Sequence, residues 1–119
     1  MKSLGADYED RAALMLQDQG LRLLERNFSG KTGEIDIIAQ DGKQLVFVEV
    51  RARTNRYYNS AAGSVDSRKQ RRIVRTAQLF LQRRPQLANM PCRFDVIAFE
   101  PPQSQIGPQV HWIRGAFTA

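Results

Sequence analysis

The chain contains 119 residues, of which 42% are hydrophobic and 25% charged, with a formal net charge of +6. This length predicts one domain over residues 1–119, and no apolar run approaches the ~18 residues of a transmembrane helix. Cys92 and His111 are the only cysteine and histidine, which excludes an internal disulfide and a standard structural zinc site. The N-terminus also lacks the apolar centre of a signal peptide. We therefore expect a reduced, cytoplasmic location away from membranes.

Positive charge is concentrated in one segment. Residues 51–84 contain ten arginines or lysines against one acidic residue, Asp66. Such a local excess predicts a polyanionic partner, namely nucleic acid. The alternative is a solvated helix that keeps the protein soluble. The candidate nucleic-acid contacts are Arg53, Arg56, Arg68, Lys69, Arg72 and Arg75.

The first predicted element is a helix over residues 5–19, because apolar side chains recur there every three or four positions. Gly20 is placed to end this helix in a left-handed conformation. Glu9 has two interpretations. As an acid near the helix start it favours the helix dipole, or it approaches the hairpin that follows as a metal ligand or positioning group.

A strand at a sheet edge is predicted over 21–28, and a hairpin follows with strands near 33–40 and 43–52. Asp41-Gly42 separates two runs rich in isoleucine, valine and phenylalanine, which is typical of a tight hairpin turn. The second strand carries apolar side chains on both of its faces. Such a strand is covered on both sides, as in the centre of an α/β sheet.

The hairpin carries carboxylates on apolar strands, where they are costly to bury without compensation. Glu34 and Asp36 share a face of the first strand, and antiparallel pairing brings Asp36 close to Glu49. These carboxylates, with the Val50 carbonyl oxygen, would suit Mg²⁺ or Mn²⁺, and Arg51 would stabilise charge on a phosphate beside it. The alternative is cross-strand ion pairing of the acids with Arg51 or Arg53.

Residues 53–64 lack periodicity and predict a loop at the mouth of this candidate site. Tyr57 and Tyr58 would either stack on bases or anchor the loop. A helix over 65–84 follows, with Ser64 or Asp66 as its N-terminal cap and Pro85 directly after it. Its predicted buried stripe comprises Ile73, Val74, Ala77, Phe80 and Leu81.

The last predicted elements are strands over 92–99 and 110–113. In the first, Phe94, Val96 and Ala98 alternate with Asp95, Ile97 and Phe99. In the second, Trp112 is expected to pack on the sheet. The element order is therefore α-β-β-β-α-β-β, which predicts an α/β fold.

Asp36 followed by Glu49-Val50-Arg51 resembles the signature of the PD-(D/E)XK nuclease superfamily. More specifically, the chain resembles the YraN family of small bacterial proteins within that superfamily. This resemblance extends nearly from end to end and rests on Gly5, Glu9, Arg26-Asn27, Gly33 to Ala39, Val46 to Val50, Arg53, Lys69, Arg72, Arg93 to Val96 and Ala116-Phe117.

The resemblance implies a restriction endonuclease-like core, a central mixed sheet flanked by helices, and a Mg²⁺-dependent DNA endonuclease or Holliday-junction-resolvase-like phosphodiesterase. It implies catalytic roles for Asp36 and Glu49, with Glu9 and Glu34 assisting. Branched DNA is an expected substrate, and a symmetric junction would require a homodimer. The chain departs from the superfamily at Arg51, where a lysine is usual, and Lys69 is the candidate for a lysine moved to another element.

Two other functions stay open at this point. The chain could bind nucleic acid with an inactive nuclease site, because arginine is a poor general base. It could also be an interaction protein whose basic surface binds an acidic partner.

Overall fold

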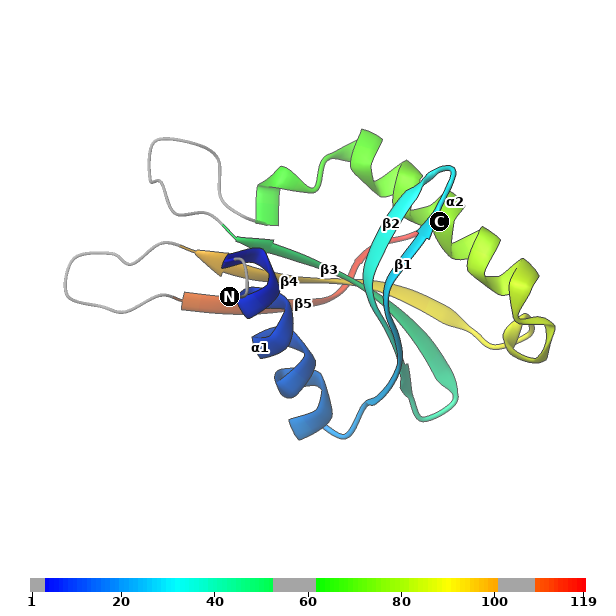
Figure 1. Cartoon of the computed structure of the whole chain (residues 1–119), viewed down its shortest axis with the longest axis horizontal. Coiled ribbons are helices and arrows are strands. Elements are labelled where there is room, and N and C mark those ends of the chain that lie inside the picture. The colour runs from blue at the N-terminus through cyan, green and yellow to red at the C-terminus, as the bar shows by residue number, and fades with distance from the viewer. Residues whose placement is uncertain (1–3, 53–61, 101–108) are drawn as a thin grey trace.

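A computed structural model describes residues 4–52, 62–100 and 109–119 (Figure 1). The order of the elements is the one that the sequence predicts. They are α1 (Leu4–Asp18), β1 (Arg22–Gly30), β2 (Gly33–Asp41), β3 (Gln44–Ala52), α2 (Ser67–Arg83), β4 (Cys92–Glu100) and β5 (Gln109–Phe117), with 3₁₀ turns at Ala62–Ser64 and Pro85–Leu87.

The five strands form one mixed sheet in the order β1-β2-β3-β4-β5. Neighbouring strands are antiparallel except β3 and β4, which are parallel. Parallel strands need a crossover connection, and α2 lies within it. The predicted α/β class is confirmed, and the order of strands and helices is consistent with a restriction endonuclease-like core.

Each helix covers one face of the sheet (Figure 1). Ile73, Ala77 and Phe80 of α2 pack on one face, as the predicted buried stripe requires. Ala12, Ala13 and Leu16 of α1 pack on the other. Strand β3 is buried on both faces, because Leu45 and Phe47 face α2 while Val46 and Val48 face α1. The prediction of a central strand is therefore confirmed.

The helix ends follow local chemistry. Gly20 has a φ of 88°, a conformation that glycine adopts without strain. The Asp66 carboxylate caps α2 by accepting a hydrogen bond of 2.9 Å from the Lys69 amide. The predicted bounds of the two helices differ from the observed ones by one or two residues at each end. Part of the predicted loop 53–64 forms the first 3₁₀ turn. Arg53, Arg56, Tyr57 and Tyr58 lie outside the described residues.

The hairpin turn is shifted by one residue from its predicted position. Asp41 pairs with Gln44, so the turn residues are Gly42 and Lys43 rather than Asp41 and Gly42. Gly42 has a φ of 61°, and glycine at the first turn position is typical of a type II′ turn. Asp41 stays in the strand because its carboxylate binds Arg93 at 2.8 Å.

Strand β5 extends to Phe117, beyond the predicted 110–113. The difference arises at Gly115, which has a φ of 59° where the pairing between β4 and β5 shifts register. This irregularity lets the strand continue past Gly115 to pair Phe117 with Phe94. Glycine inside a strand often marks such a bulge.

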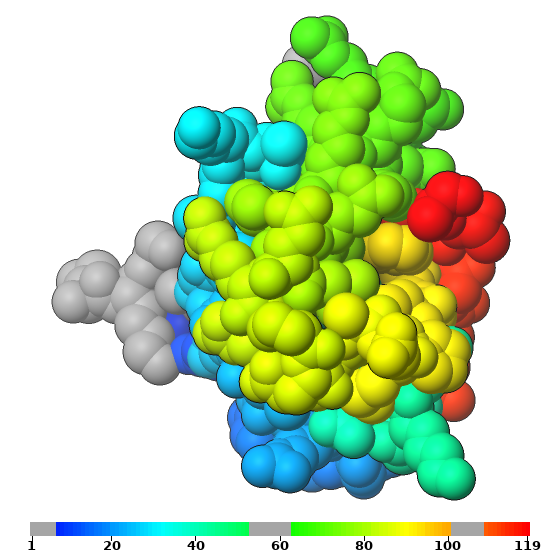
Figure 2. Space-filling view, turned by 90° about the vertical axis from the view of Figure 1, so that its right-hand side faces the viewer, coloured from blue at the N-terminus to red at the C-terminus, as the bar shows by residue number. Residues whose placement is uncertain are grey.

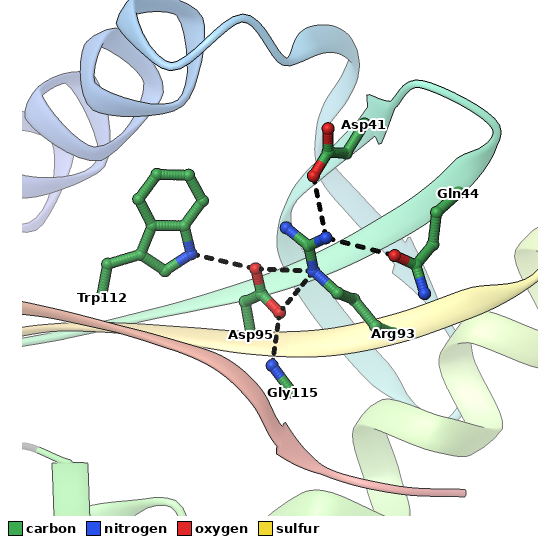
Figure 3. Close-up of polar contacts among 6 residues, drawn as sticks. All are labelled: Asp41, Gln44, Arg93, Asp95, Trp112 and Gly115. Carbon is green, nitrogen blue, oxygen red and sulfur yellow. Dashed lines mark hydrogen bonds and ion pairs between the residues drawn. The ribbon is translucent and has the colours of Figure 1, made fainter.

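A polar network around one buried carboxylate links β4 to β5 and to the β2–β3 turn (Figure 3). Asp95 has no exposed surface. Its carboxylate accepts hydrogen bonds from the Trp112 indole and the Gly115 amide at 2.9 Å, and from Arg93 at 3.1 and 3.2 Å. Arg93 also donates to Asp41 at 2.8 Å and Gln44 at 3.2 Å. The network thus ties β5 and the β2–β3 turn to β4.

We predict that Asp95→Ala lowers the free energy of unfolding by about 3–5 kcal/mol, because it removes the buried carboxylate that pairs with Arg93 and accepts from the Trp112 indole and the Gly115 amide. Trp112→Phe removes one donor and should cost about 1.5–3 kcal/mol. Urea unfolding followed by far-UV circular dichroism measures both. An Asp95→Ala protein within 1 kcal/mol of the wild type would show that the network does not stabilise the fold.

Candidate active site where β2 and β3 separate

The site lies where two strands of the sheet part. In the described residues the β2–β3 ladder ends at the pair Ile37–Val48, so Asp36 and Glu49 are the first residues beyond it. The Val50 amide donates a hydrogen bond of 2.8 Å to Asp36 Oδ2. The Asp36 carboxylate therefore accepts the hydrogen bond that a backbone carbonyl of the neighbouring strand would otherwise accept, and it is held in the gap between the strands.

Asp36 also sits beside an irregularity in β1. Asn27 has a φ of 55° and lies between the pairs Arg26–Ile37 and Phe28–Ile35. Positive φ is uncommon outside glycine, and asparagine tolerates it better than most residues. Ile35 packs toward α2 and Ile37 toward α1, although residues two apart in a regular strand share a face. The strand is therefore locally twisted at Asp36.

Three carboxylates converge on one side of this gap. Glu9 of α1 and Glu34 and Asp36 of β2 place ligand oxygens within 4.8 Å of one another. Glu9 and Asp36 are half-buried, while Glu34 is exposed. Asp7, not Glu9, is the acid in the first turn of α1. This geometry favours the interpretation in which Glu9 approaches the hairpin.

Glu49 lies on the opposite side of the gap. It continues the row of Leu45 and Phe47, which face α2, and only 4% of its surface is exposed. Its Oε1 is 3.5 Å from Lys69 Nζ and 3.7 Å from an Arg51 guanidinium nitrogen. The structure thus brings two cations to Glu49, Lys69 from α2 and Arg51 from the same strand.

Two glutamates beside the gap have a raised pKa, and Asp36 contributes to both shifts. Burial, a hydrogen bond with Asp36 and the charge of Asp36 raise the pKa of Glu9 from 4.5 to about 7. Burial and the charge of Asp36 likewise raise the pKa of Glu49 from 4.5 to about 7, against the lowering effect of Lys69 and Arg51. Asp36 therefore interacts with acids on both sides of the sheet.

The predicted site residues do not form a single cluster. Glu9, Glu34 and Asp36 come together, whereas Glu49 pairs with Lys69 and Arg51. Val50 contributes its amide to Asp36, and a ligand role for its carbonyl stays a prediction. Lys69 is half-buried, and Arg68, Arg72 and Arg75 are exposed along α2.

Two residues of the site were not predicted from the sequence. Ser64 accepts a hydrogen bond of 2.9 Å from Arg51 Nε and so orients that guanidinium. It lies in a segment without periodicity, which offers no indication of this contact. Asn27 shapes the strand beside Asp36. Its tolerance of positive φ was the one available indication.

The acidic group fits a hard divalent cation. Mg²⁺ and Mn²⁺ prefer oxygen ligands and are commonly bound through one or two carboxylates. Three carboxylate side chains from α1 and β2 meet these requirements. The raised pKa of Glu9 points the same way, because burial and the charges of Asp36 and Glu34 raise it and a cation would offset that repulsion.

Fold and site together define a small α/β protein with a restriction endonuclease-like core and an acidic site where two central strands separate. A family model described as uncharacterised protein family UPF0102 matches residues 8–99. The chain belongs to this family, which confirms the resemblance to YraN. In the part of the chain that the structure describes, no helix is long and apolar enough to cross a membrane.

Curated relatives match over almost the whole chain. A UPF0102 protein of Alcanivorax borkumensis is 49% identical over 98% of this chain and 92% of its own length. One from Janthinobacterium is 49% identical over 93% of this chain and 84% of its own length. One from Pseudomonas fluorescens is 46% identical over 95% of this chain and 91% of its own length. The names of these relatives state family membership and assign no activity.

The two raised pKa values predict how stability depends on pH. Between pH 4.5 and about 7 the folded protein binds more protons at Glu9 and Glu49 than the unfolded chain does. Their contribution to stability is therefore full below pH 4.5 and is lost as the pH rises through about 7. We expect Glu9→Gln to be more stable than the wild type at pH 8 in the absence of metal, and to gain less over the wild type at pH 5.

Thermal unfolding in EDTA at pH 5 and pH 8 measures this effect. Asp7→Asn, which removes an exposed acid from the same helix, is the matched control and should leave the pH dependence unchanged. Millimolar Mg²⁺ should stabilise the wild type more at pH 8 than at pH 5. Equal pH dependence in wild type and Glu9→Gln would contradict the assignment.

Proposed function

We propose that this protein is a cytoplasmic DNA endonuclease that depends on Mg²⁺ or Mn²⁺ and accepts branched DNA. The observation that carries the proposal is the position of Asp36. It is bonded to the Val50 amide and lies between Glu9 and Glu49, both of which have a pKa near 7. Carboxylates with perturbed pKa values are frequent where catalysis occurs.

The acidic residues would bind the ion. Glu9, Glu34 and Asp36 are the candidate ligands, since their oxygens converge. Glu49 is a further candidate, because the charge of Asp36 acts on its carboxylate. When bound, Mg²⁺ or Mn²⁺ would neutralise charge at the scissile phosphate and lower the pKa of the attacking water.

The basic residues would bind and stabilise the phosphate. Lys69 and Arg51 place their cations beside Glu49, where charge would develop during hydrolysis. In that reaction a water oxygen bonds to phosphorus, the bridging P–O bond breaks, the water proton passes to a carboxylate, and the leaving oxygen takes up a proton from solvent to become a hydroxyl. A carboxylate with a pKa near 7 is suited to accept that proton at neutral pH.

A second candidate function is nucleic-acid binding without cleavage. It is favoured by Arg51, which stands where the superfamily has a lysine and is already engaged with Ser64 and Glu49. Arginine and lysine are not interchangeable at such a position. Under this candidate the wild type binds DNA without cutting it, and Arg51→Lys would restore cleavage.

We predict that purified protein cleaves DNA in the presence of Mg²⁺ or Mn²⁺ and that Asp36→Asn lowers the rate by at least about 100-fold. Asparagine keeps an acceptor for the Val50 amide but removes the charge, so folding and DNA binding should survive. The assay compares linear duplex, single-stranded and four-way-junction DNA. Asp7→Asn is the charge-matched control and should cleave like the wild type.

Three outcomes would overturn the nuclease assignment. Cleavage that persists unchanged in both Asp36→Asn and Glu49→Gln would point to a contaminating nuclease. Metal-independent binding without cleavage on every substrate would leave the binding function alone. Failure to bind any nucleic acid at low salt would exclude both and favour an acidic protein partner.

A further inference from the structure

A second basic feature lies at the other end of α2, against the turn between β1 and β2. Figure 2 shows the tip of this hairpin, in cyan, beside the helix, which runs from green to yellow. A cavity of about 510 Å³ opens between them, and we call it the distal groove. Its polar lining comprises Lys31, Thr32, Arg75, Gln78, Gln82 and Arg83.

The distal groove carries uncompensated positive charge. Lys31, Arg75 and Arg83 line it, and no acidic residue does among the residues described. None of these three cations forms an ion pair with a described acid, whereas other arginines of the chain do. Those ion pairs are Arg26 with Asp10, Arg84 with Glu25, and Arg93 with Asp41 and Asp95.

The walls of the groove are held in place by contacts of their own. Thr32 and Thr76 share a hydrogen bond of 2.7 Å between the turn and α2, and Thr76 also donates to the Arg72 carbonyl at 2.8 Å. The Arg83 guanidinium lies 5.7 Å from the centre of the Phe28 ring, a cation–π contact. A site fixed before binding loses less conformational entropy when a ligand arrives.

A row of cations connects the distal groove to the candidate active site. Lys69 and Arg83 belong to one helix and lie on nearly the same side of it, separated by about 21 Å at a rise of 1.5 Å per residue. Exposed Arg72 follows Lys69 on that side. A small anion would use one of these cations, whereas a polymer with regularly spaced negative charges matches the row.

We propose that the distal groove binds a backbone phosphate of the DNA whose scissile phosphate lies at the carboxylate site. The 21 Å separation corresponds to about six base pairs, because phosphates on one strand repeat every ~3.4 Å along the duplex. Lys31, Arg75 and Arg83 would neutralise that phosphate, and the Gln78 and Gln82 amides can donate hydrogen bonds to it. The spacing rests on the proposed function, whereas the binding itself does not.

The binding test uses duplex DNA in EDTA, so that cleavage plays no part. Fluorescence anisotropy gives the dissociation constant from 50 to 200 mM salt. In the double variant Lys31→Gln/Arg83→Gln, the slope of log affinity against log salt should become shallower by about 0.9, since the variant loses one phosphate contact and each such contact contributes about 0.9. Binding should weaken on all sequences alike.

The control variant Lys43→Gln/Arg84→Gln removes the same two charges outside the groove. Lys43 lies in the β2–β3 turn and Arg84 is paired with Glu25. This control should retain the slope of the wild type. Equal slopes in the two double variants would contradict phosphate binding in the distal groove while leaving the nuclease assignment intact. Loss of wild-type binding altogether would overturn both.

The spacing is tested on a cleaved substrate. A single neutral methylphosphonate linkage placed about six base pairs from the cut should raise KM several-fold and leave kcat unchanged, because the lost contact is remote from the chemistry. The same linkage should not affect Lys31→Gln/Arg83→Gln further. An equal KM increase in that variant would contradict contact between this phosphate and the distal groove.

Discussion

The hydrogen bond from the Val50 amide to Asp36 Oδ2 is the constraint on which the candidate site depends. It uses a carboxylate as the acceptor for a strand amide at the point where β2 and β3 separate. An ordinary ladder pair there would have closed the gap. Instead, Asp36 remains between the two strands, and its charge reaches Glu9 on the α1 side and Glu49 on the α2 side. Burial and this neighbouring charge together raise the pKa of both glutamates.

Both helices must pack correctly for the site to exist. The first helix supplies Glu9 and the second supplies Lys69, and each covers a different face of the sheet. The site therefore joins acidic groups on one face to cations on the other through a gap between strands. The same α2 helix continues from Lys69 to the distal groove, so the element that completes the candidate active site also carries the cations for a longer polyanion.

Periodic features were predictable from the sequence, and local irregularities were not. Alternation in residues 92–99 placed Phe94 and Asp95 on opposite faces, and the double-sided apolar pattern of residues 43–52 predicted a central strand. The proximity of Asp36 to Glu49 followed from the hairpin. The grouping of Asp36 with Glu9 and Glu34 instead of Glu49 depends on the twist at Asn27, which no regular pattern encodes. The length of β5 and the turn at Gly42 depend on tertiary contacts of Asp95 and Asp41.

The central claim is that the acids around Asp36 form a cation site. Anomalous diffraction from crystals grown with Mn²⁺ tests it most directly, because it locates the ion. The account predicts an anomalous peak in contact with the Asp36 carboxylate and at least one of Glu9, Glu34 and Glu49, and no peak there in Asp36→Asn crystals. A wild-type crystal soaked in millimolar Mn²⁺ at pH 8 without density at these carboxylates would contradict it.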